Sequence, residues 1–281
     1  MKKEIKTLLD DLNQGRISRR EFVRRFTVLA GSAAAIWSVL PEMNARGQIS
    51  DPEDPNLIVE TITYPAPHGD MMACLARPKG EEKLPAVIVI HENRGLNEHI
   101  KDVTRRMAQE GFIALAPDGN SSTGGTPDDP DAARQALYAV DREKQAENFT
   151  AAVAYLKTHP LTTGKVGCTG FCWGGAMTNQ VAVRSPELDA AVPYYGSVPA
   201  SEDVPKIKAA LMCHYAGEDP RINAGIPEFE EAMKKTGIEY QIYIYEGAYH
   251  AFNNDTGSRY HEEAAKLAWK RTVGFFREKL K

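Results

Sequence analysis

Short, continuously apolar runs alternate along the chain with longer stretches in which apolar residues recur at helical spacing. A run that is apolar throughout predicts a strand covered on both faces. The predicted strands are residues 86–91, 112–116, 165–169, 190–195, 209–215 and 240–245. The predicted helices are residues 97–110, a long stretch from after 131 to about 157, 176–183, 228–235 and 260–280. This alternation predicts an α/β protein with a mostly parallel, doubly wound sheet.

The first two predicted strands are not separated by a predicted helix. Residues 57–64 and 71–77 are strand-like, and the turn residues between them predict an antiparallel N-terminal hairpin. A proline-broken polar linker at 51–55 precedes the hairpin. We therefore predict two parts: a leader over residues 1–50 and a main α/β domain over residues 51–281.

The leader has two interpretations. Arg19-Arg20 before the modestly apolar run 26–40 resembles a twin-arginine (Tat) export signal, which predicts a periplasmic protein. The run is short for a membrane helix, which needs about 20 apolar residues. Two further arginines at 24–25 and a poor cleavage site at 43–45 favour the alternative. In this alternative the segment is a helix that packs on the main domain or joins subunits of a homo-oligomer, and the protein is cytoplasmic.

A cysteine lies where a predicted strand turns into a predicted helix, in Gly170-Phe171-Cys172-Trp173-Gly174-Gly175. Strand, Gly-x-nucleophile-x-Gly and helix together are the nucleophile elbow of α/β-hydrolases, and they predict that fold. Cys172 would attack as a thiolate, and the Trp173 backbone N–H would point at the developing oxyanion. The alternative is a cysteine that only packs, because cysteine is among the most buried residue types.

The predicted nucleophile needs a base and an acid that orients it, in the chain order nucleophile, acid, histidine. His250 follows the last predicted strand, at the sheet edge where such folds keep their chemistry, so we predict it as the base. Asp219 follows the preceding strand and is the predicted acid. Glu218 is the alternative acid, and both carboxylates could instead be a solvated turn pair.

A fourth candidate is Glu92, at the carboxyl end of the strand 86–91. A carboxylate near Cys172 could hold the thiol proton until substrate arrives. The loop it begins normally supplies the second oxyanion donor, here the Asn93 N–H. The alternative role for Glu92 is an ion pair with Arg94 or Arg105.

Composition narrows the function classes. The 34 Lys and Arg residues against 38 Asp and Glu residues give a net charge of −4, and no basic stripe with interleaved aromatics suggests a nucleic-acid partner. Cys74, Cys168 and Cys213 fall inside apolar runs, which predicts buried free thiols. No zinc-like spacing of Cys and His is completed. We expect no metal and no cofactor.

Four segments together resemble the dienelactone hydrolase family, in particular bacterial members with a twin-arginine-like leader that are provisionally described as carboxymethylenebutenolidases. They are HENRGL at 91–96, GFCWGG at 170–175, GEDPRIN at 217–223 and GAYHAFNND at 247–255. The resemblance covers residues 57–281. It implies a Cys172–His250–Asp219 triad and a glutamate, matching Glu92, that pairs with the resting thiol and is displaced by substrate.

The sequence departs from the family at one position. The resemblance implies an arginine that binds the substrate carboxylate four residues after the catalytic histidine, where this chain has Asn254. It also implies a second such arginine before the elbow, for which Arg134 and Arg142 are candidates. Loss of one bidentate arginine indicates a different lactone or ester as substrate.

Together these observations predict a hydrolase of lactones or small activated esters that acts on small molecules through a thioester acyl-enzyme. A thiolate favours activated carbonyls over amides, so peptidase activity is not expected. The alternative is a non-catalytic small-molecule binder or scaffold on the same fold, because fold alone does not prove activity.

Overall fold

The computed structural model describes Thr7, Arg25, Phe26 and residues 50–281, and the last of these ranges forms one compact unit. The predicted leader therefore lies almost entirely outside the described residues. Within them, no helix is both long enough and apolar enough to cross a membrane.

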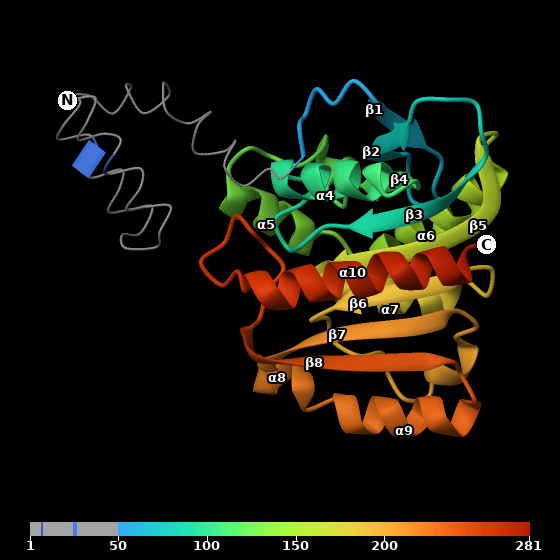
Figure 1. Cartoon of the computed structure of the whole chain (residues 1–281), viewed down its shortest axis with the longest axis vertical. Coiled ribbons are helices and arrows are strands. Elements are labelled where there is room, and N and C mark those ends of the chain that lie inside the picture. Colours follow the sequence, from blue (N-terminus) through green and yellow to red (C-terminus); the bar gives the residue numbers. More distant parts are fainter. Residues whose placement is uncertain (1–6, 8–24, 27–49) are drawn as a thin grey trace. The chain divides into compact units, whose positions relative to one another are not determined.

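One eight-stranded sheet forms the centre of the unit, in the order β1-β2-β4-β3-β5-β6-β7-β8 (Figure 1). The first two junctions, β1 with β2 and β2 with β4, are antiparallel, and all others are parallel. The strands are β1 (Leu57–Tyr64), β2 (Met71–Pro78), β3 (Leu84–Ile90), β4 (Ile113–Pro117), β5 (Thr162–Phe171), β6 (Ala190–Tyr194), β7 (Ala210–Glu218) and β8 (Tyr240–Tyr249). The predicted mostly parallel sheet with an antiparallel N-terminal hairpin is confirmed.

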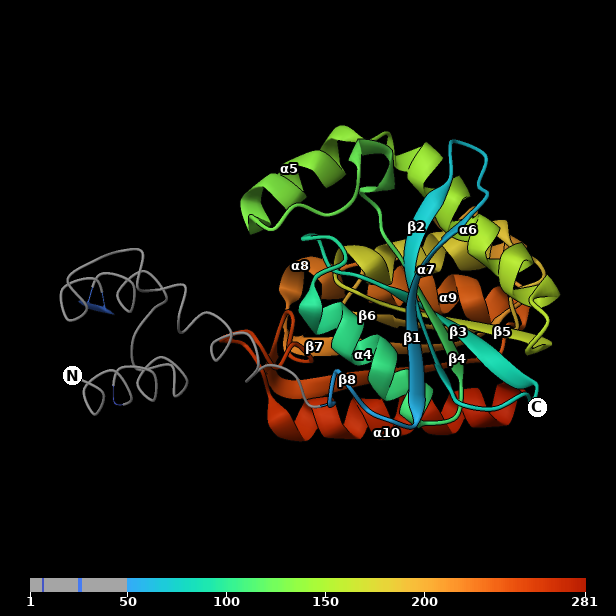
Figure 2. The same ribbon diagram turned by 90° about the horizontal axis from the view of Figure 1, so that it is seen from above.

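Helices cover both faces of this sheet (Figures 1 and 2). One face carries α4 (Glu98–Gln109) and α10 (Glu262–Lys279), whose apolar residues share a buried cluster with the strands. The other face carries α5 (Pro130–Ala139), α6 (Arg142–Thr158), α7 (Trp173–Arg184) and α9 (Ile226–Thr236). The sheet is therefore buried on both sides, which explains why its parallel strands are apolar throughout.

Several predicted boundaries are shifted by a few residues, and two differ more substantially. The single helix expected to end near residue 157 is two helices, α5 and α6, because the Asp141 side chain accepts hydrogen bonds from the N–H groups of Glu143 and Lys144 and starts a new helix. The last strand runs four residues beyond its predicted end at 245, to Tyr249, so His250 follows the strand directly. A short helix that was not predicted, α8 (Pro220–Asn223), follows β7.

A buried polar network joins β7, β8 and α10 on the face of the sheet that α10 covers. His214 is fully buried, with Thr272 Oγ1 at 3.1 Å from its Nε2 and the Tyr245 hydroxyl at 2.9 Å from its Nδ1. Burial, and secondarily the nearby Arg271, lowers the pKa of His214 to about 3. The imidazole is therefore neutral in the folded protein at all ordinary pH values.

We expect this histidine to make the protein acid-sensitive. Above the ordinary histidine pKa of about 6.5 it is neutral folded and unfolded, and contributes no pH dependence. As pH falls below that value only the unfolded chain binds the proton, so stability drops by up to about 1.4 kcal/mol per pH unit. Urea unfolding at pH 7, 6, 5 and 4 should show a shallower decline for His214→Phe than for the parent. Equal slopes would contradict the assignment.

Candidate active site

Cys172 lies at the turn between β5 and α7 in a conformation that side chains rarely adopt, with φ 56° and ψ −111°. Such a backbone costs about 1–3 kcal/mol and persists only where the surroundings hold it. Here they do: a Cβ on Gly174 would lie 2.3 Å from the His91 carbonyl oxygen, and one on Gly170 would lie 2.3 Å from the Gly174 carbonyl oxygen. The strand and helix therefore meet backbone to backbone, which only glycine permits.

The Cys172 thiol is partly accessible, whereas the other three cysteines are buried and all four are free, as predicted for Cys74, Cys168 and Cys213. Burial, and next the negative charge of Glu92, raises the pKa of Cys172 to about 11. A hydrogen bond from the Trp173 backbone and the charge of Arg221 act in the opposite direction. The resting thiol is therefore protonated at neutral pH.

The imidazole of His250 and the carboxylate of Asp219 are brought together by neighbouring strands. His250 follows β8, Asp219 follows β7, and His250 Nδ1 hydrogen-bonds to Asp219 Oδ2. Both side chains are largely buried, at 18% and 7% exposure. The contact leaves Nε2 as the ring nitrogen for proton transfer. Glu218, the alternative acid, is exposed and makes no such contact.

Tyr195, which we did not predict, connects this histidine to Glu92. It follows β6 with a φ of 37°, and its ring centroid lies 5.1 Å from that of His250. Its buried hydroxyl donates a long hydrogen bond of 3.5 Å to Glu92 Oε1. Its place as the last residue of the predicted strand 190–195 was the one signal in the sequence that could have found it.

The Glu92 carboxylate receives a second, shorter hydrogen bond from Asn254, whose Nδ2 lies 2.7 Å from Glu92 Oε2. The alternative ion pairs are not formed. Arg94 is exposed and makes no ion pair with Glu92, and Arg105 instead donates through Nε to Ser50 Oγ at 3.0 Å. Neutral donors thus hold Glu92, which leaves its negative charge uncompensated beside the thiol.

His91 organises the loop that carries Glu92 and Asn93. The Gly119 N–H donates to His91 Nε2 at 2.9 Å, so the proton lies on Nδ1, which contacts the Glu92 carbonyl oxygen at 2.6 Å. The ring stacks on Trp173 with centroids 5.3 Å apart. The Asn93 and Trp173 N–H groups, the predicted oxyanion donors, therefore belong to two segments that pack directly on each other.

Polar and charged contacts from α4 brace the loop after His250. Asp255 Oδ1 lies 3.1 Å from His99 Nδ1, and Asp255 Oδ2 lies 3.3 Å from Arg106 Nη2. Arg106 Nε lies 3.0 Å from Asp102 Oδ2.

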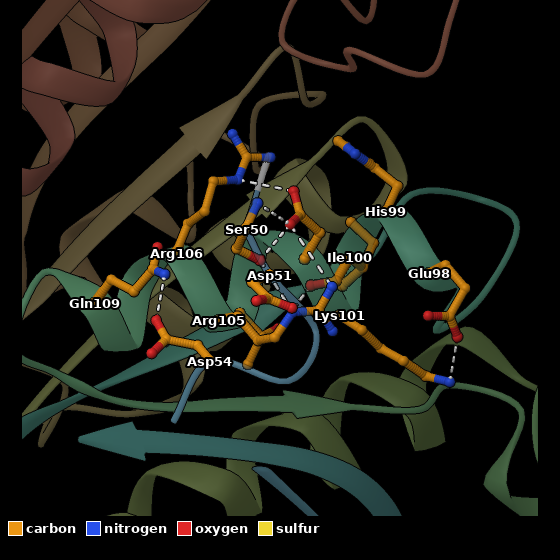
Figure 3. Close-up of polar contacts among 12 residues, drawn as sticks. Ser50, Asp51, Asp54, Glu98, His99, Ile100, Lys101, Arg105, Arg106 and Gln109 are labelled. Carbon is orange, nitrogen blue, oxygen red and sulfur yellow. Dashed lines mark hydrogen bonds and ion pairs between the residues drawn. The ribbon is translucent and has the colours of Figure 1, made fainter. Parts of the chain in front are cut away.

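Asp102 has no exposed surface and also accepts from the backbone N–H and the hydroxyl of Ser50. Figure 3 shows Ser50 beside the α4 residues Arg105 and Arg106. The chain of contacts thus runs from Ser50, where the unit begins, to Asp255, which follows Asn254. Since Asn254 hydrogen-bonds to Glu92, this network helps to hold the loop that positions the Glu92 carboxylate.

The roles predicted for Arg134 and Arg142 stay predictions, while two other arginines lie beside His250. Arg134 on α5 and Arg142 on α6 are exposed and contact none of the candidate catalytic residues, although α5 lies at the same end of the unit as α8 (Figures 1 and 2). Arg221 and Arg259 instead line an open depression of about 580 Å³ with His250, together with Glu218, Asp219, Tyr249 and Ser258. In the described part of the chain, no three His, Cys, Asp or Glu side chains are grouped to hold a metal ion.

Comparisons with known proteins agree with this architecture. A model of the dienelactone hydrolase family matches residues 71–280. A Saccharolobus solfataricus protein provisionally named carboxymethylenebutenolidase is 36% identical over 252 residues, covering 77% of this chain and 97% of that protein. One from Methylorubrum extorquens, with the same provisional name, is 32% identical over 269 residues, covering 90% and 92%.

The similarity extends to three dimensions. The crystal structure of a provisionally assigned dienelactone hydrolase from Klebsiella pneumoniae matches with a TM-score of 0.71 at 30% identity, covering 79% of this chain and 99% of that one. The family model begins at β2 and ends just after α10, so it includes every strand except β1, the elbow and the histidine loop. This chain, with its α/β-hydrolase fold, is therefore a hydrolase of the dienelactone hydrolase family.

Proposed function

We propose that the protein hydrolyses lactones or small activated esters with Cys172 as nucleophile, His250 as base and Asp219 as the acid that orients it. The observation that carries the proposal is the cysteine at a positive φ on the strand-to-helix turn, at the same sheet edge as the His250–Asp219 pair. A bystander cysteine would have no reason to occupy a strained backbone among glycines that admit no side chain.

The proposed reaction starts from a protonated thiol. Substrate entry displaces Glu92, which takes the thiol proton and passes it to His250, leaving a thiolate beside an imidazolium. The thiolate attacks the acyl carbon, while the N–H groups of Asn93 and Trp173 hold the oxyanion. His250 then gives its proton to the leaving oxygen, and a thioester remains on Cys172. Water, deprotonated by His250, releases the acid, and the proton returns to the sulfur.

The direct test is to assay the purified protein with a panel of lactones and aryl esters and to trap the intermediate. Rapid acid quenching during turnover of an aryl acetate should give a Cys172 peptide carrying one acetyl group. Absence of turnover across the panel, with no acylated cysteine, would favour the alternative of a non-catalytic binder or scaffold.

Removing the negative charge of Glu92 should lower the pKa of the Cys172 thiol. Glu92→Gln removes the second-largest influence that raises the Cys172 pKa, so more thiolate forms at pH 8. We expect alkylation of Cys172 by iodoacetamide to accelerate by about tenfold, one pKa unit corresponding to 1.36 kcal/mol. Ester turnover should fall in the same variant, because the acceptor of the thiol proton is lost.

Glu187→Gln is the matched control, since it removes the same charge from an exposed position beyond the far end of α7. Its alkylation rate and turnover should equal those of the parent. If Glu92→Gln leaves the alkylation rate and its pH dependence unchanged, Glu92 does not hold the thiol proton.

We also propose that residues 1–50 are a leader distinct from the domain over 51–281, and that it exports the protein by the twin-arginine route. Arg19-Arg20 and the weakly apolar run after them support this proposal. The alternative is a cytoplasmic protein whose N-terminal helix joins subunits into a homo-oligomer. N-terminal sequencing of periplasmic and cytoplasmic fractions, with the molar mass in solution, separates the two.

A further inference from the structure

The strand that precedes His250 also forms an open edge of the sheet. β8 is the last strand in the sheet order and pairs only with β7 (Figure 1). The Leu211 N–H donates to the Glu239 carbonyl oxygen at 2.9 Å, so the odd-numbered residues that follow Glu239 turn their backbone groups toward β7. The residues between them turn these groups outward: Tyr240, Ile242 and Ile244. In the described part of the chain, no hydrogen bond reaches these outward groups.

This edge lacks the features that usually keep a strand edge from pairing with another. Exposed edge strands are commonly short or carry lysine or proline. β8 has 10 residues, YQIYIYEGAY, with neither lysine nor proline among them, and its charged residue Glu246 follows the open stretch. The Ile244 side chain is 56% exposed. The opposite edge strand, β1, instead exposes polar side chains: Glu60, Thr61 and Thr63.

A second copy of β8 fits this edge. In an antiparallel pair with a two-fold axis at Ile242, that residue lies opposite Ile242 of the partner subunit, and Tyr240 lies opposite Ile244 of the partner subunit. Each such pair exchanges both backbone hydrogen bonds, because these residues all face outward. Pairs of aromatic and β-branched side chains across two strands are favourable. A two-fold contact also closes on itself, so it forms a dimer and not a filament.

The charges beside the edge favour the same pairing. The Arg271 guanidinium lies 3.8 Å from the Tyr243 ring centroid and donates to the Tyr245 hydroxyl at 3.2 Å, and among the described residues it forms no ion pair. The two-fold pairing sets Tyr245 opposite Glu239 of the partner subunit, on the face of the sheet where Arg271 lies. Glu239 is 59% exposed and pairs with Lys279 of its own chain at 2.6 Å, which leaves its other oxygen for a second cation.

We propose that the protein is a homodimer in which the β8 strands of two copies pair antiparallel about Ile242 and join their sheets into one. β8 leads directly into His250, so the pairing also holds the outer side of the strand that positions the imidazole. The interface uses only the main unit, so it differs from a dimer joined through the N-terminal helix.

The first test measures the molar mass of the full-length protein by light scattering at micromolar concentration. The parent should give twice the 31.0 kDa of one chain. Ile244→Lys puts a residue that blocks natural strand edges at an exposed position, so the molar mass should halve while circular dichroism stays unchanged.

Val59→Lys is the matched control, because it adds the same charge to β1, the opposite edge strand, where Val59 is 41% exposed. This variant should remain a dimer. A monomeric parent overturns the proposal. A dimer that persists in Ile244→Lys also overturns it, and transfers the contact to another surface such as the N-terminal helix.

Cross-linking tests the register of the two strands. With the axis at Ile242, the Cα atoms of its two copies lie about 5.5 Å apart, within the range of a disulfide. The two copies of Ile244 lie roughly 14 Å apart along the strands. Ile242→Cys should therefore form a covalent dimer under mild oxidation, and Ile244→Cys should form no more than the parent. Equal or reversed cross-linking overturns this register. Neither measurement uses ester turnover, so the proposed function stands or falls separately.

Discussion

Cys172→Ala should abolish hydrolysis of aryl esters, lowering kcat by about 10⁴-fold or more, the scale on which loss of a nucleophile acts in hydrolases of this kind. The fold should survive, because the thiol is only partly buried and alanine keeps the Cβ that this backbone already accommodates. Circular dichroism and the melting temperature check that point. Initial rates with 4-nitrophenyl acetate measure the activity.

Cys172→Ser gives the second arm of this experiment. A hydroxyl is far less acidic than a thiol, and the uncompensated charge of Glu92 disfavours an alkoxide even more than a thiolate. We expect the serine variant to be much slower than the parent, and equal rates would contradict the role given to Glu92.

Cys74→Ala is the matched control for both variants, because Cys74 is buried in β2, away from the sheet edge, and should leave turnover intact. Turnover retained in Cys172→Ala would place the nucleophile elsewhere.

Asp102→Ala should cost about 3–5 kcal/mol of unfolding free energy, because it removes the buried carboxylate that Arg105 and Arg106 share. Asp102 has no exposed surface, and it contacts Arg106 and both hydrogen-bond donors of Ser50. Urea unfolding followed by tryptophan fluorescence measures the loss. This loss is a large fraction of the roughly 5–15 kcal/mol unfolding free energy of a typical domain.

Glu262→Ala is the control for this prediction. Its carboxylate pairs with Lys266 one helical turn away, with both side chains mostly exposed. Such a solvated pair contributes little to stability, because water and salt screen its charges. If Asp102→Ala costs no more than Glu262→Ala, the α4 network does not brace the unit, and its suggested support of the histidine loop fails with it.

Local features of the site could be predicted from the sequence because the residues that determine each of them are close together along the chain. The turn at Cys172 needs glycines at 170 and 174, since a Cβ at either would collide with a carbonyl oxygen. The order of the strands could be read from apolar runs, although β7 and β8 end three and four residues later than expected, and this order placed Asp219 and His250 after two consecutive strands that pair in the sheet. The pairing of Asp219 with His250 remains compatible with the chemistry proposed from sequence.

Contacts across the sheet edge were not predictable in this way. Glu92 meets Tyr195 and Asn254 across 103 and 162 residues of chain, and nothing local to any of the three residues indicates the others. Sequence reasoning instead suggested an ion pair of Glu92 with Arg94 or Arg105, because these positive charges are close to Glu92 along the chain. The roles of Arg134 and Arg142 stay predictions, because they depend on an alignment rather than on a contact.

The backbone contact at the elbow has a consequence for altering this enzyme. Gly174 lies so close to the end of β3 that no side chain separates the two main chains, and Gly175 lies as close to the Tyr194 carbonyl oxygen at the end of β6. The sulfur is thus located by main-chain geometry that point substitutions can break but not adjust. Engineering for new substrates should therefore leave this junction untouched and vary exposed positions such as 122–124, 220–221 and 256–259, which carry none of the proposed catalytic side chains.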